Sequence, residues 1–488
     1  MNVSISDKKG GAGLSPSMKS ALVLGASRSG LAAAAALVKL GLTVTLSDRR
    51  AREALPGLVE ARSMGIAFVG QEELVAGWPT VDLVIKSPGV PTEAPPVVKA
   101  REKGVQVWSE VELAYALFSN PFDAVTGTNG KTTTTALLGH LFRTAGRPVR
   151  ILGNIGTAVT SVAGSIAAED ELVVEVSSFQ LEDIHAFRPA VGIFLNLTSD
   201  HLDRHGSMER YLECKANLFV NQGPDDVAVL SLDDPAVAQL GEQLGTRSGG
   251  PRVAYFSTAA VGGTDGSSGS SAAKNGPVSW VDGGWIFLEG RRALALDKIQ
   301  IPGRHNLENS LAAGTAALAR GVDIDAVAEG LRTFTGVEHR LERAGIVAGV
   351  TYVNDSKATN VDATLTALSA YPQGTHLILG GRDKASDYRP VARACAGGCR
   401  AVYLIGEATP LIEDAFREVM MNEGIKNVPE PRPYGDLETA VKAASRAARA
   451  GEVVLLAPAC ASFDQYANFE QRGEHFRQIV VALGGEIQ

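Results

Sequence analysis

Short apolar runs alternate with helix-like stretches along most of the chain. The run at residues 21–24 leads into a glycine turn, a stretch with helical spacing at 31–40 and a second apolar run at 43–46. Short apolar runs separated by amphipathic stretches are typical of parallel strands joined by helices. The alternation therefore predicts an α/β fold that begins with a βαβ unit.

The alternation restarts twice further along the chain. Apolar runs recur in the middle and last regions, at 122–126, 171–176, 191–196, 351–353, 377–379, 402–405 and 453–456. We expect three α/β domains: a Rossmann-like domain at 1–110, a central P-loop ATPase-like domain at 111–336 and a second Rossmann-like domain at 337–488. Residues 1–17 and the glycine-serine tract at 262–276 are expected to be flexible.

Composition narrows the class of protein. Of 488 residues, 45% are hydrophobic and 20% are charged, which is ordinary for a folded globular chain, and the net charge of -8 argues against nucleic acid as a partner. The four cysteines form no CxxC motif, which fits a reducing compartment. Without an apolar leader or a membrane-length apolar run, we expect a cytoplasmic protein with no membrane partner.

A phosphate-binding loop is the clearest chemical motif. The run at 122–126 leads into Gly127-Thr128-Asn129-Gly130-Lys131-Thr132-Thr133, and a helical pattern follows. Backbone N–H groups at a helix start point at anions, a lysine adds charge, and a threonine hydroxyl can bind Mg2+. The longer standard motif has a glycine where this chain has Val125, so the loop is a shortened form. The motif predicts a bound ATP.

A second glycine turn opens the chain. Residues 25–30 resemble a dinucleotide fingerprint whose middle glycine is replaced by Ser27, and Asp48 ends the next strand. Such a turn could bind NAD or the diphosphate of a nucleotide-sugar, and the missing glycine makes a dinucleotide less favoured. Another turn, Ser87-Pro88-Gly89, follows a later strand and reads most simply as a tight turn.

Metal ligands are sought among acids and imidazoles at strand ends. Glu175 interrupts the run at 172–176, where a buried carboxylate needs a cation or hydrogen bonds, although a water-facing glutamate on an edge strand is the alternative. In the cluster at 200–205, we expect a role for His201 and a surface position for His205. Lys215, in an amphipathic stretch, is by default a surface lysine.

Three polar blocks follow strands of the last region. They lie at 354–360, 380–384 and 458–464. Ligands of open α/β sheets bind at the carboxyl ends of the strands, so Lys357, Thr359 and Lys384 could contact carboxylate or phosphate groups.

Together these blocks resemble the Mur ligase superfamily of peptidoglycan synthesis over essentially the whole chain. The segment GTNGKTT at 127–133 is shared across the superfamily. The segments NDSKATN at 354–360 and APACASFDQYANFEQRGEHF at 457–476 are more similar to its D-glutamate-adding branch. The resemblance implies an ATP-dependent ligase that joins D-glutamate to UDP-N-acetylmuramoyl-L-alanine through an acyl phosphate, releasing ADP and phosphate.

The resemblance also implies roles for particular residues. Lys131, Glu175, His201 and Lys215 would be catalytic, with Thr132, Glu175, His201 and a carbamylated Lys215 holding Mg2+, at two sites. ATP would bind residues 127–133 with Asn309, Arg340, Asp355 and Lys357. The UDP-sugar would lie along Ser29, Arg49, Arg50, Gly89 and Asn154, and D-glutamate would meet Thr359, Lys384, Ser462 and Phe469. We expect a monomer.

Alternatives remain open at this point. Another ligase of the superfamily could add a different amino acid, the first turn could belong to an NAD-dependent oxidoreductase, or the chain could be a non-catalytic nucleotide-binding regulator. Arg28 departs from the small or apolar residue common in the family, which affects only the expected substrate contacts.

Overall fold

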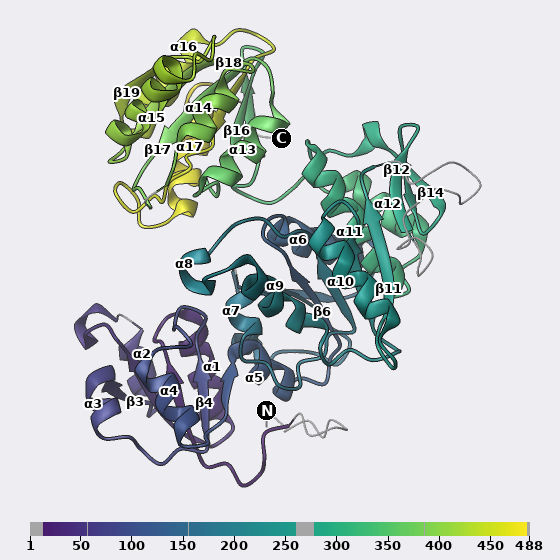
Figure 1. The fold of residues 1–488 in the computed structure, drawn as a ribbon, viewed down its shortest axis with the longest axis vertical. Coiled ribbons are helices and arrows are strands. Elements are labelled where there is room, and N and C mark those ends of the chain that lie inside the picture. The colour runs from purple at the N-terminus through teal and green to yellow at the C-terminus, as the bar shows by residue number, and fades with distance from the viewer. Residues whose placement is uncertain (1–12, 56, 155, 260–277, 385, 486–488) are drawn as a thin grey trace. The chain divides into compact units, whose positions relative to one another are not determined.

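The computed structural model describes residues 13–485 except positions 56, 155, 260–277 and 385. The expected insertion at 262–276 and residues 1–12 of the expected tail lie outside the described residues. Two compact units divide the chain: the first comprises residues 1–298 and 308–333, and the second comprises 299–307 and 334–488. The fold class predicted from the sequence is confirmed, because both units contain mostly parallel sheets with helices on them (Figure 1).

The first sheet of unit one has five parallel strands in the order β3-β2-β1-β4-β5. Its strands are β1 (Ser20–Leu24), β2 (Thr43–Asp48), β3 (Ala67–Gly70), β4 (Leu83–Lys86) and β5 (Val107–Ser109). Its helices are α1 (Arg28–Lys39), α2 (Leu58–Ser63), α3 (Gln71–Ala76), α4 (Pro95–Glu102) and α5 (Glu110–Leu117). The chain order reverses at β1 and β4, which is where an open sheet of this kind binds ligands.

The second sheet of unit one has nine strands in the order β14-β13-β12-β11-β10-β9-β6-β8-β7. Its strands are β6 (Phe122–Thr126), β7 (Val149–Gly153), β8 (Glu171–Glu175), β9 (Val191–Phe194), β10 (Val227–Ser231), β11 (Arg252–Ser257), β12 (Val278–Asp282), β13 (Trp285–Leu288) and β14 (Arg291–Ala295). Strands β12 to β14 pair antiparallel, and the others pair parallel. The strands β12 to β14 were not predicted from the sequence. They are short and follow the glycine-serine tract.

Helices flank this second sheet. They are α6 (Lys131–Thr144), α7 (Ser178–Leu181), α8 (Leu202–His205), α9 (Met208–Ala216), α10 (Pro235–Thr246), α11 (Arg304–Ala319) and α12 (Ile324–Thr333). Every residue of β6, β8 and β9 is buried, so these strands read as continuous apolar runs rather than alternating ones. The charged groups Asp123, Glu171 and Glu175 stand out within them because burial of a charge requires partners.

The sheet of unit two has six strands in the order β15-β16-β20-β17-β18-β19. Its strands are β15 (Glu342–Val347), β16 (Val350–Asn354), β17 (Thr375–Gly380), β18 (Cys399–Ile405), β19 (Pro431–Gly435) and β20 (Val453–Leu456). Its helices are α13 (Val361–Ala370), α14 (Arg389–Cys395), α15 (Thr409–Asn422), α16 (Leu437–Ala447) and α17 (Phe469–Ala482). The edge strand β15 runs antiparallel to β16, and the other pairs are parallel.

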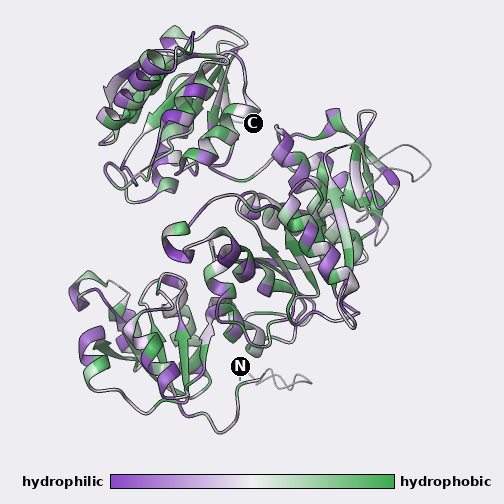
Figure 2. Cartoon of the chain, in the orientation of Figure 1, coloured by the Kyte–Doolittle hydropathy of each residue, from purple (hydrophilic) through white to green (hydrophobic). Residues whose placement is uncertain are grey.

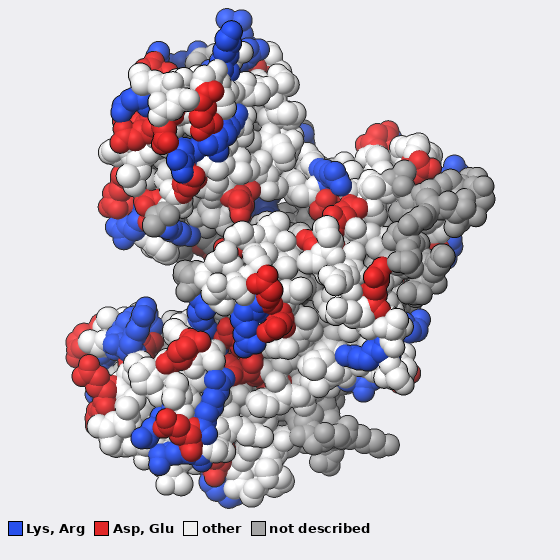
Figure 3. Space-filling model, viewed as in Figure 1, with Lys and Arg blue, Asp and Glu red and all other residues white. Residues whose placement is uncertain are grey.

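Hydropathy follows burial in each sheet. The strands are mainly hydrophobic, while the helices carry hydrophilic faces (Figure 2). Acidic and basic side chains are interspersed over the face of the molecule in Figure 3, and that face shows no broad basic surface among the described residues. Among the described residues, none of the helices combines the length and the apolar character needed to span a membrane.

Candidate functional site

The first glycine turn joins β1 to α1 through two close backbone approaches. Gly25 has a φ of +94°, a conformation that favours glycine, and its carbonyl accepts a hydrogen bond from the Ser87 hydroxyl at 3.1 Å. A Cβ atom on Gly30 would lie 1.8 Å from the Gly25 carbonyl oxygen. These two glycines therefore let the start of α1 approach the end of β1.

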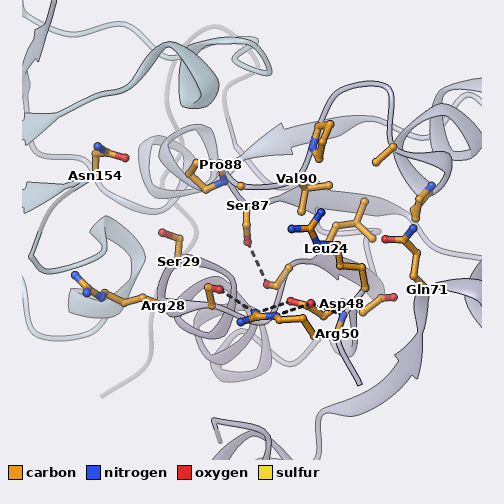
Figure 4. A pocket seen from close by; sticks show the side chains of 18 of the residues that line it. Leu24, Arg28, Ser29, Asp48, Arg50, Gln71, Ser87, Pro88, Val90 and Asn154 are labelled. Carbon is orange, nitrogen blue, oxygen red and sulfur yellow. Dashed lines mark hydrogen bonds and ion pairs between the residues drawn. The ribbon is translucent and has the colours of Figure 1, made fainter. Parts of the chain in front are cut away.

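A cavity of about 500 Å3 lies beside this turn. Its lining includes all five residues expected along the UDP-sugar: Ser29, Arg49, Arg50, Gly89 and Asn154. Figure 4 labels three of them, Ser29, Arg50 and Asn154. Ser29 lies in α1, the two arginines and Gly89 follow strands of the five-stranded sheet, and Asn154 follows β7 of the nine-stranded sheet. The structure thus brings residues from distant parts of unit one to one cavity.

The charges at the cavity favour an anion. The Asp48 carboxylate accepts hydrogen bonds from the Ala26 N–H at 2.7 Å and from the Arg50 guanidinium at 2.9 Å. Burial opposes ionisation of Asp48, but the hydrogen bonds from Arg50 and Ala26 outweigh it and lower its pKa to about 2. Because Arg50 balances Asp48, the side chains of Arg28 and Arg49 leave the lining net positive.

The phosphate loop is held in place by an amide. The Asn196 Oδ1 atom accepts from the Asn129 N–H at 2.8 Å, and its Nδ2 group donates to the Asn129 carbonyl at 3.2 Å. Gly130 precedes α6 with a φ of +85°, and a Cβ atom there would lie 2.3 Å from Asn309 Oδ1. That oxygen also accepts from the Thr134 hydroxyl at 3.1 Å. Asn309 therefore lies directly against the loop.

Two lysines meet at one carbonyl of this loop. The Lys131 Nζ atom donates to the Gly127 carbonyl at 3.0 Å and to the Thr128 carbonyl at 2.7 Å. The Lys215 Nζ atom donates to the same Gly127 carbonyl at 2.7 Å. The loop thus concentrates cationic groups where a helix start already favours anions.

Glu175 connects the phosphate loop with the cavity. It ends β8 between β6 and β7, is 2% exposed, and so does not face water from an edge strand. Its Oε2 atom accepts from the Thr132 hydroxyl at 2.8 Å, and its Oε1 atom accepts from the Asn154 amide at 3.4 Å. Asn154 also lines the cavity. A single carboxylate therefore joins the two candidate sites.

Lys215 is not the surface lysine that the helical pattern suggests. It is 1% exposed on α9, and its ammonium lies 4.6 Å from the centre of the Tyr211 ring. Burial, together with the charge of Lys131, lowers the pKa of Lys215 well below its ordinary value. No local pattern indicates this burial, since Lys215 lies among the polar residues of an amphipathic helix.

The two histidines of the 200–205 cluster differ in burial. The His201 side chain is 49% exposed, lies 3.5 Å from Asp200 and makes an edge contact with the Phe179 ring. His205, expected at the surface, is buried, and its Nε2 atom lies 3.0 Å from the Ser178 hydroxyl. The surface prediction for His205 is wrong because the ring packs between those of Phe179 and Tyr211.

A buried group near His205 has the donor atoms of a metal site. It comprises Glu182, His205 and Cys214, whose ligand atoms lie within 4.8 Å of one another. The Glu182 carboxylate already contacts Lys86 at 2.7 Å and Arg204 at 3.2 Å. Because these two cations balance the charge of Glu182, we interpret the group as a cluster of ion pairs rather than as a metal site.

The polar blocks of unit two meet around α17. The Ser356 hydroxyl donates to the Phe469 carbonyl at 2.8 Å, and the Lys357 ammonium lies 5.9 Å from the centre of the Phe469 ring. The Thr359 N–H donates to the Lys357 carbonyl, while Ser462 is buried at the start of the loop before α17. Lys384 is exposed after β17.

Arg472 is a buried residue of unit two that sequence reasoning missed. It is 1% exposed, and its guanidinium donates to the Ser356 hydroxyl at 3.0 Å and to the Cys460 carbonyl at 3.2 Å. It thereby fastens the 354–360 block to the 458–464 block. A pattern of residues along one helix does not reveal such a contact between two loops.

The turn around Arg340 is strained. His339 and Leu341, on either side of it, have φ values of +61° and +43°, and such strain clusters at functional sites. The Asp355 carboxylate accepts from the Leu341 N–H at 3.3 Å. Burial raises the pKa of Asp355 to about 6, against the opposing charges of Arg340 and Lys357. Arg340, Asp355 and Lys357 therefore form one electrostatic group in unit two.

Two family models match the chain. The Mur ligase middle domain matches residues 125–317, and the glutamate ligase domain of Mur ligases matches residues 339–460. The chain belongs to the Mur ligases, a class of ATP-dependent ligases. Membership in a ligase family removes the basis for the oxidoreductase and regulator alternatives.

Relatives similar over nearly the whole chain narrow this class. Proteins from Pelotomaculum thermopropionicum, Acidobacterium capsulatum and Solibacter usitatus are 44%, 41% and 42% identical, over 95%, 96% and 95% of this chain and 98%, 97% and 98% of their own. Each is named UDP-N-acetylmuramoylalanine–D-glutamate ligase. Within the Mur ligases, the chain therefore belongs to the D-glutamate ligase family.

Solved structures share the fold. The UDP-N-acetylmuramate-alanine ligase of Thermotoga maritima matches with a TM-score of 0.56 and 21% identity, over 95% of this chain and 99% of its own. A pseudomurein peptide ligase type C from Methanothermus fervidus matches with a TM-score of 0.55 and 18% identity, over 95% of this chain and 100% of its own. At this identity the likeness supports the fold.

Proposed function

We propose that the chain joins D-glutamate to UDP-N-acetylmuramoyl-L-alanine at the expense of ATP, releasing ADP and phosphate. The observation that carries this proposal is the path from the cavity through Asn154 and Glu175 to Thr132 at the phosphate loop. A carboxylate at the end of a molecule in the cavity would thereby lie next to a phosphate held by the loop. That juxtaposition suits transfer of a phosphoryl group to a carboxylate.

The nucleotide-sugar occupies the cavity in this proposal. Its diphosphate lies against the start of α1 and the arginines Arg49 and Arg50, with Ser29 and Gly89 along its length. Its alanyl carboxylate reaches Asn154, whose side-chain amide already donates a hydrogen bond to a carboxylate oxygen, that of Glu175. The net positive lining is what a diphosphate requires.

The triphosphate occupies residues 127–133 in this proposal. Gly127 and Gly130 allow a close backbone approach, Lys131 balances the charge of the terminal phosphate, and Thr128, Asn129 and Thr133 complete the cradle. Asn309 would contact the nucleotide from beside the loop. We assign Arg340, Asp355 and Lys357 to the nucleotide as well.

The donor set fits Mg2+, which prefers oxygen ligands. Thr132 and Glu175 offer a hydroxyl and a buried carboxylate 2.8 Å apart, and we assign Glu175, His201 and a carbamylated Lys215 to two metal positions. Carbamylation needs a neutral amine, and burial favours that form by lowering the pKa of Lys215. The amine nitrogen would bond to the carbon of CO2 with loss of one proton, which gives an anion. When bound, Mg2+ would neutralise charge that develops on the phosphate oxygens.

The chemistry then proceeds in two steps. The alanyl carboxylate oxygen attacks the γ-phosphorus, the bond to ADP breaks, and Lys131 stabilises the charge that accumulates. The D-glutamate amine then attacks the acyl carbon, loses a proton, and phosphate leaves as the amide forms. Thr359, Lys384, Ser462 and Phe469 are assigned to D-glutamate. We place this reaction in the cytoplasm and assign it to a monomer.

The test is the mass of the product. The full chain is incubated with ATP, Mg2+ and UDP-N-acetylmuramoyl-L-alanine, and separate reactions receive D-glutamate, L-glutamate, L-alanine or meso-diaminopimelate. We expect one product, with D-glutamate, at the mass of the amide and with one phosphate released per bond. Turnover with another amino acid alone, or ATP hydrolysis without coupling to both substrates, would refute the proposal.

A further inference from the structure

Arg204 connects the cavity wall with the residues around the phosphate loop. We propose that Arg204 is a positioning residue that holds residues 87–91 in register with Lys215 and the loop at 127–128. The inference rests on the proposed function, since it assumes that the cavity and the loop hold the two partners of one reaction. Arg204 itself touches neither substrate in this proposal.

The guanidinium of Arg204 binds the cavity wall through two backbone carbonyls. From α8 it donates to the Pro88 carbonyl at 3.2 Å and to the Val90 carbonyl at 3.0 Å, and both residues line the cavity. The side chain is 15% exposed. A planar guanidinium can make such paired contacts in a fixed geometry, whereas a lysine ammonium cannot reproduce them.

On its other side, Arg204 begins a stacked column. We use this term for Arg204, Phe179, His205, Tyr211 and Lys215. The guanidinium lies 4.4 Å from the centre of the Phe179 ring, which stacks on His205 at 5.1 Å and 14°. His205 contacts the Tyr211 ring at 5.0 Å, and Lys215 lies over Tyr211 at 4.6 Å.

The column ends at the phosphate loop. Lys215 donates to the Gly127 carbonyl at 2.7 Å, and the Tyr211 hydroxyl accepts from the Thr128 hydroxyl at 3.5 Å. Phe179 also makes an edge contact with His201 at 5.0 Å. Rings and charges packed in this manner restrict one another, so a shift at Pro88 or Val90 would be transmitted towards Gly127.

Neutralisation of charge does not explain the position of Arg204. The Glu182 carboxylate that it contacts is also bound by Lys86 at 2.7 Å and accepts from the Thr92 hydroxyl at 2.8 Å. Without Arg204, Glu182 would therefore keep a buried cationic partner. Besides the ion pair with Glu182, the contacts that would be lost are the two to the cavity wall and the one to Phe179, which are positional.

The test compares Arg204→Lys with Arg210→Lys. Arg210 lies on the neighbouring helix α9, is 59% exposed and pairs with Glu213, so its replacement is a matched control outside the column. We expect Arg204→Lys to lower kcat on the order of 10- to 100-fold while KM for ATP changes less than about threefold. Displacement of the reacting groups slows the chemical step, whereas the contacts that bind ATP stay in place. The control should match the wild type.

A second readout does not depend on turnover. Hydrogen–deuterium exchange is measured on the full chain with UDP-N-acetylmuramoyl-L-alanine alone. In the wild type we expect the ligand to slow exchange at residues 86–92 and also at 201–216. In Arg204→Lys the slowing should remain at 86–92 and be lost at 201–216.

Each outcome is decisive. If the wild type forms no product, the proposed function fails. If the wild type forms product but Arg204→Lys keeps a normal kcat and slowed exchange in both segments, only the positioning role fails. Should Arg204→Lys not fold, Phe179→Leu interrupts the column and leaves every ion pair intact. It should reproduce the loss of slowing at 201–216, and unchanged exchange there would overturn the proposal.

Discussion

Two strand–turn–helix segments of unit one are similar in form but are held in place by different residues. The turn between β1 and α1 is fastened by Asp48, which accepts from the Ala26 N–H at 2.7 Å. The loop between β6 and α6 is fastened by Asn196, which accepts from the Asn129 N–H at 2.8 Å. One anchor is a carboxylate with an arginine partner, and the other is a neutral amide.

The difference follows from what each turn is proposed to hold. A carboxylate without a cation partner at the backbone of the loop would repel a triphosphate, so an amide provides the same acceptor without the charge. The Glu175 carboxylate, which also lies at the loop, is proposed to bind Mg2+. At the first turn, the charge of Asp48 is balanced by Arg50, which itself lines the cavity. The Asp48 carboxylate therefore serves to orient the Arg50 guanidinium. Glycine turns of similar sequence are thus distinguished by the residues that fasten them.

The largest effect should come from removing the cation of the second turn. We expect Lys131→Ala to lower kcat by about 1000-fold or more, because a preorganised charge at the transferring phosphate is lost. Product formation is followed by mass, and circular dichroism checks that the fold is retained. Turnover within a few fold of the wild type would contradict the role given to Lys131.

The next effect concerns the backbone of the second turn. In Gly130→Ala, the left-handed conformation costs about 1–2 kcal/mol and the new Cβ atom meets Asn309 Oδ1, so the unfolding midpoint should fall. The matched control is Gly146→Ala, just after α6, where φ is +72° and a Cβ atom would meet nothing within 4 Å. Equal destabilisation by the two changes, in thermal unfolding, would show that the contact with Asn309 contributes nothing.

Exchanging the two anchors sharpens the comparison directly. Asn196→Asp keeps an acceptor for the Asn129 N–H, but it removes the donor to the Asn129 carbonyl and brings a negative charge to the loop. We therefore expect KM for ATP to rise on the order of 10-fold. KM for the UDP-sugar should stay within twofold. A rise in both constants, or in neither, would mean that the neutrality of Asn196 is irrelevant to nucleotide binding.

The smallest effect is the reverse exchange. Asp48→Asn removes a charge-assisted pair with Arg50, which should lower the free energy of unfolding by about 1–2 kcal/mol at pH 7. Because the folded-state pKa of Asp48 is lowered to about 2, its contribution is complete above the unfolded-state pKa and is lost as pH falls towards 2. Urea midpoints should therefore differ by the full amount above about pH 5 and converge as the pH approaches 2.

Much of the fold was predictable because its strands are apolar runs in a regular alternation. The runs at 122–126 and 453–456 coincide with β6 and β20. The family and its activity class were predictable from the loop at 127–133 and the two blocks of the last region, and the comparisons confirm them. The individual site residues stay predictions, although the structure brings those expected along the UDP-sugar to one cavity.

The rest depends on contacts between residues far apart in the chain. Arg204 meets Pro88, 116 positions away, and Asn196 meets Asn129, 67 positions away. No local periodicity carries such information. His205 illustrates the same limit, since a four-residue helix among charged neighbours gives no sign that one ring faces an aromatic stack.

Glu175 has a practical consequence for inhibitor design. Its side chain contacts Thr132 of the phosphate loop through one oxygen and Asn154 of the cavity wall through the other. A single substitution of Glu175 would therefore disturb the loop and the cavity together. A compound anchored on that carboxylate would depend on a residue whose replacement disturbs the phosphate loop and the wall of the cavity at the same time.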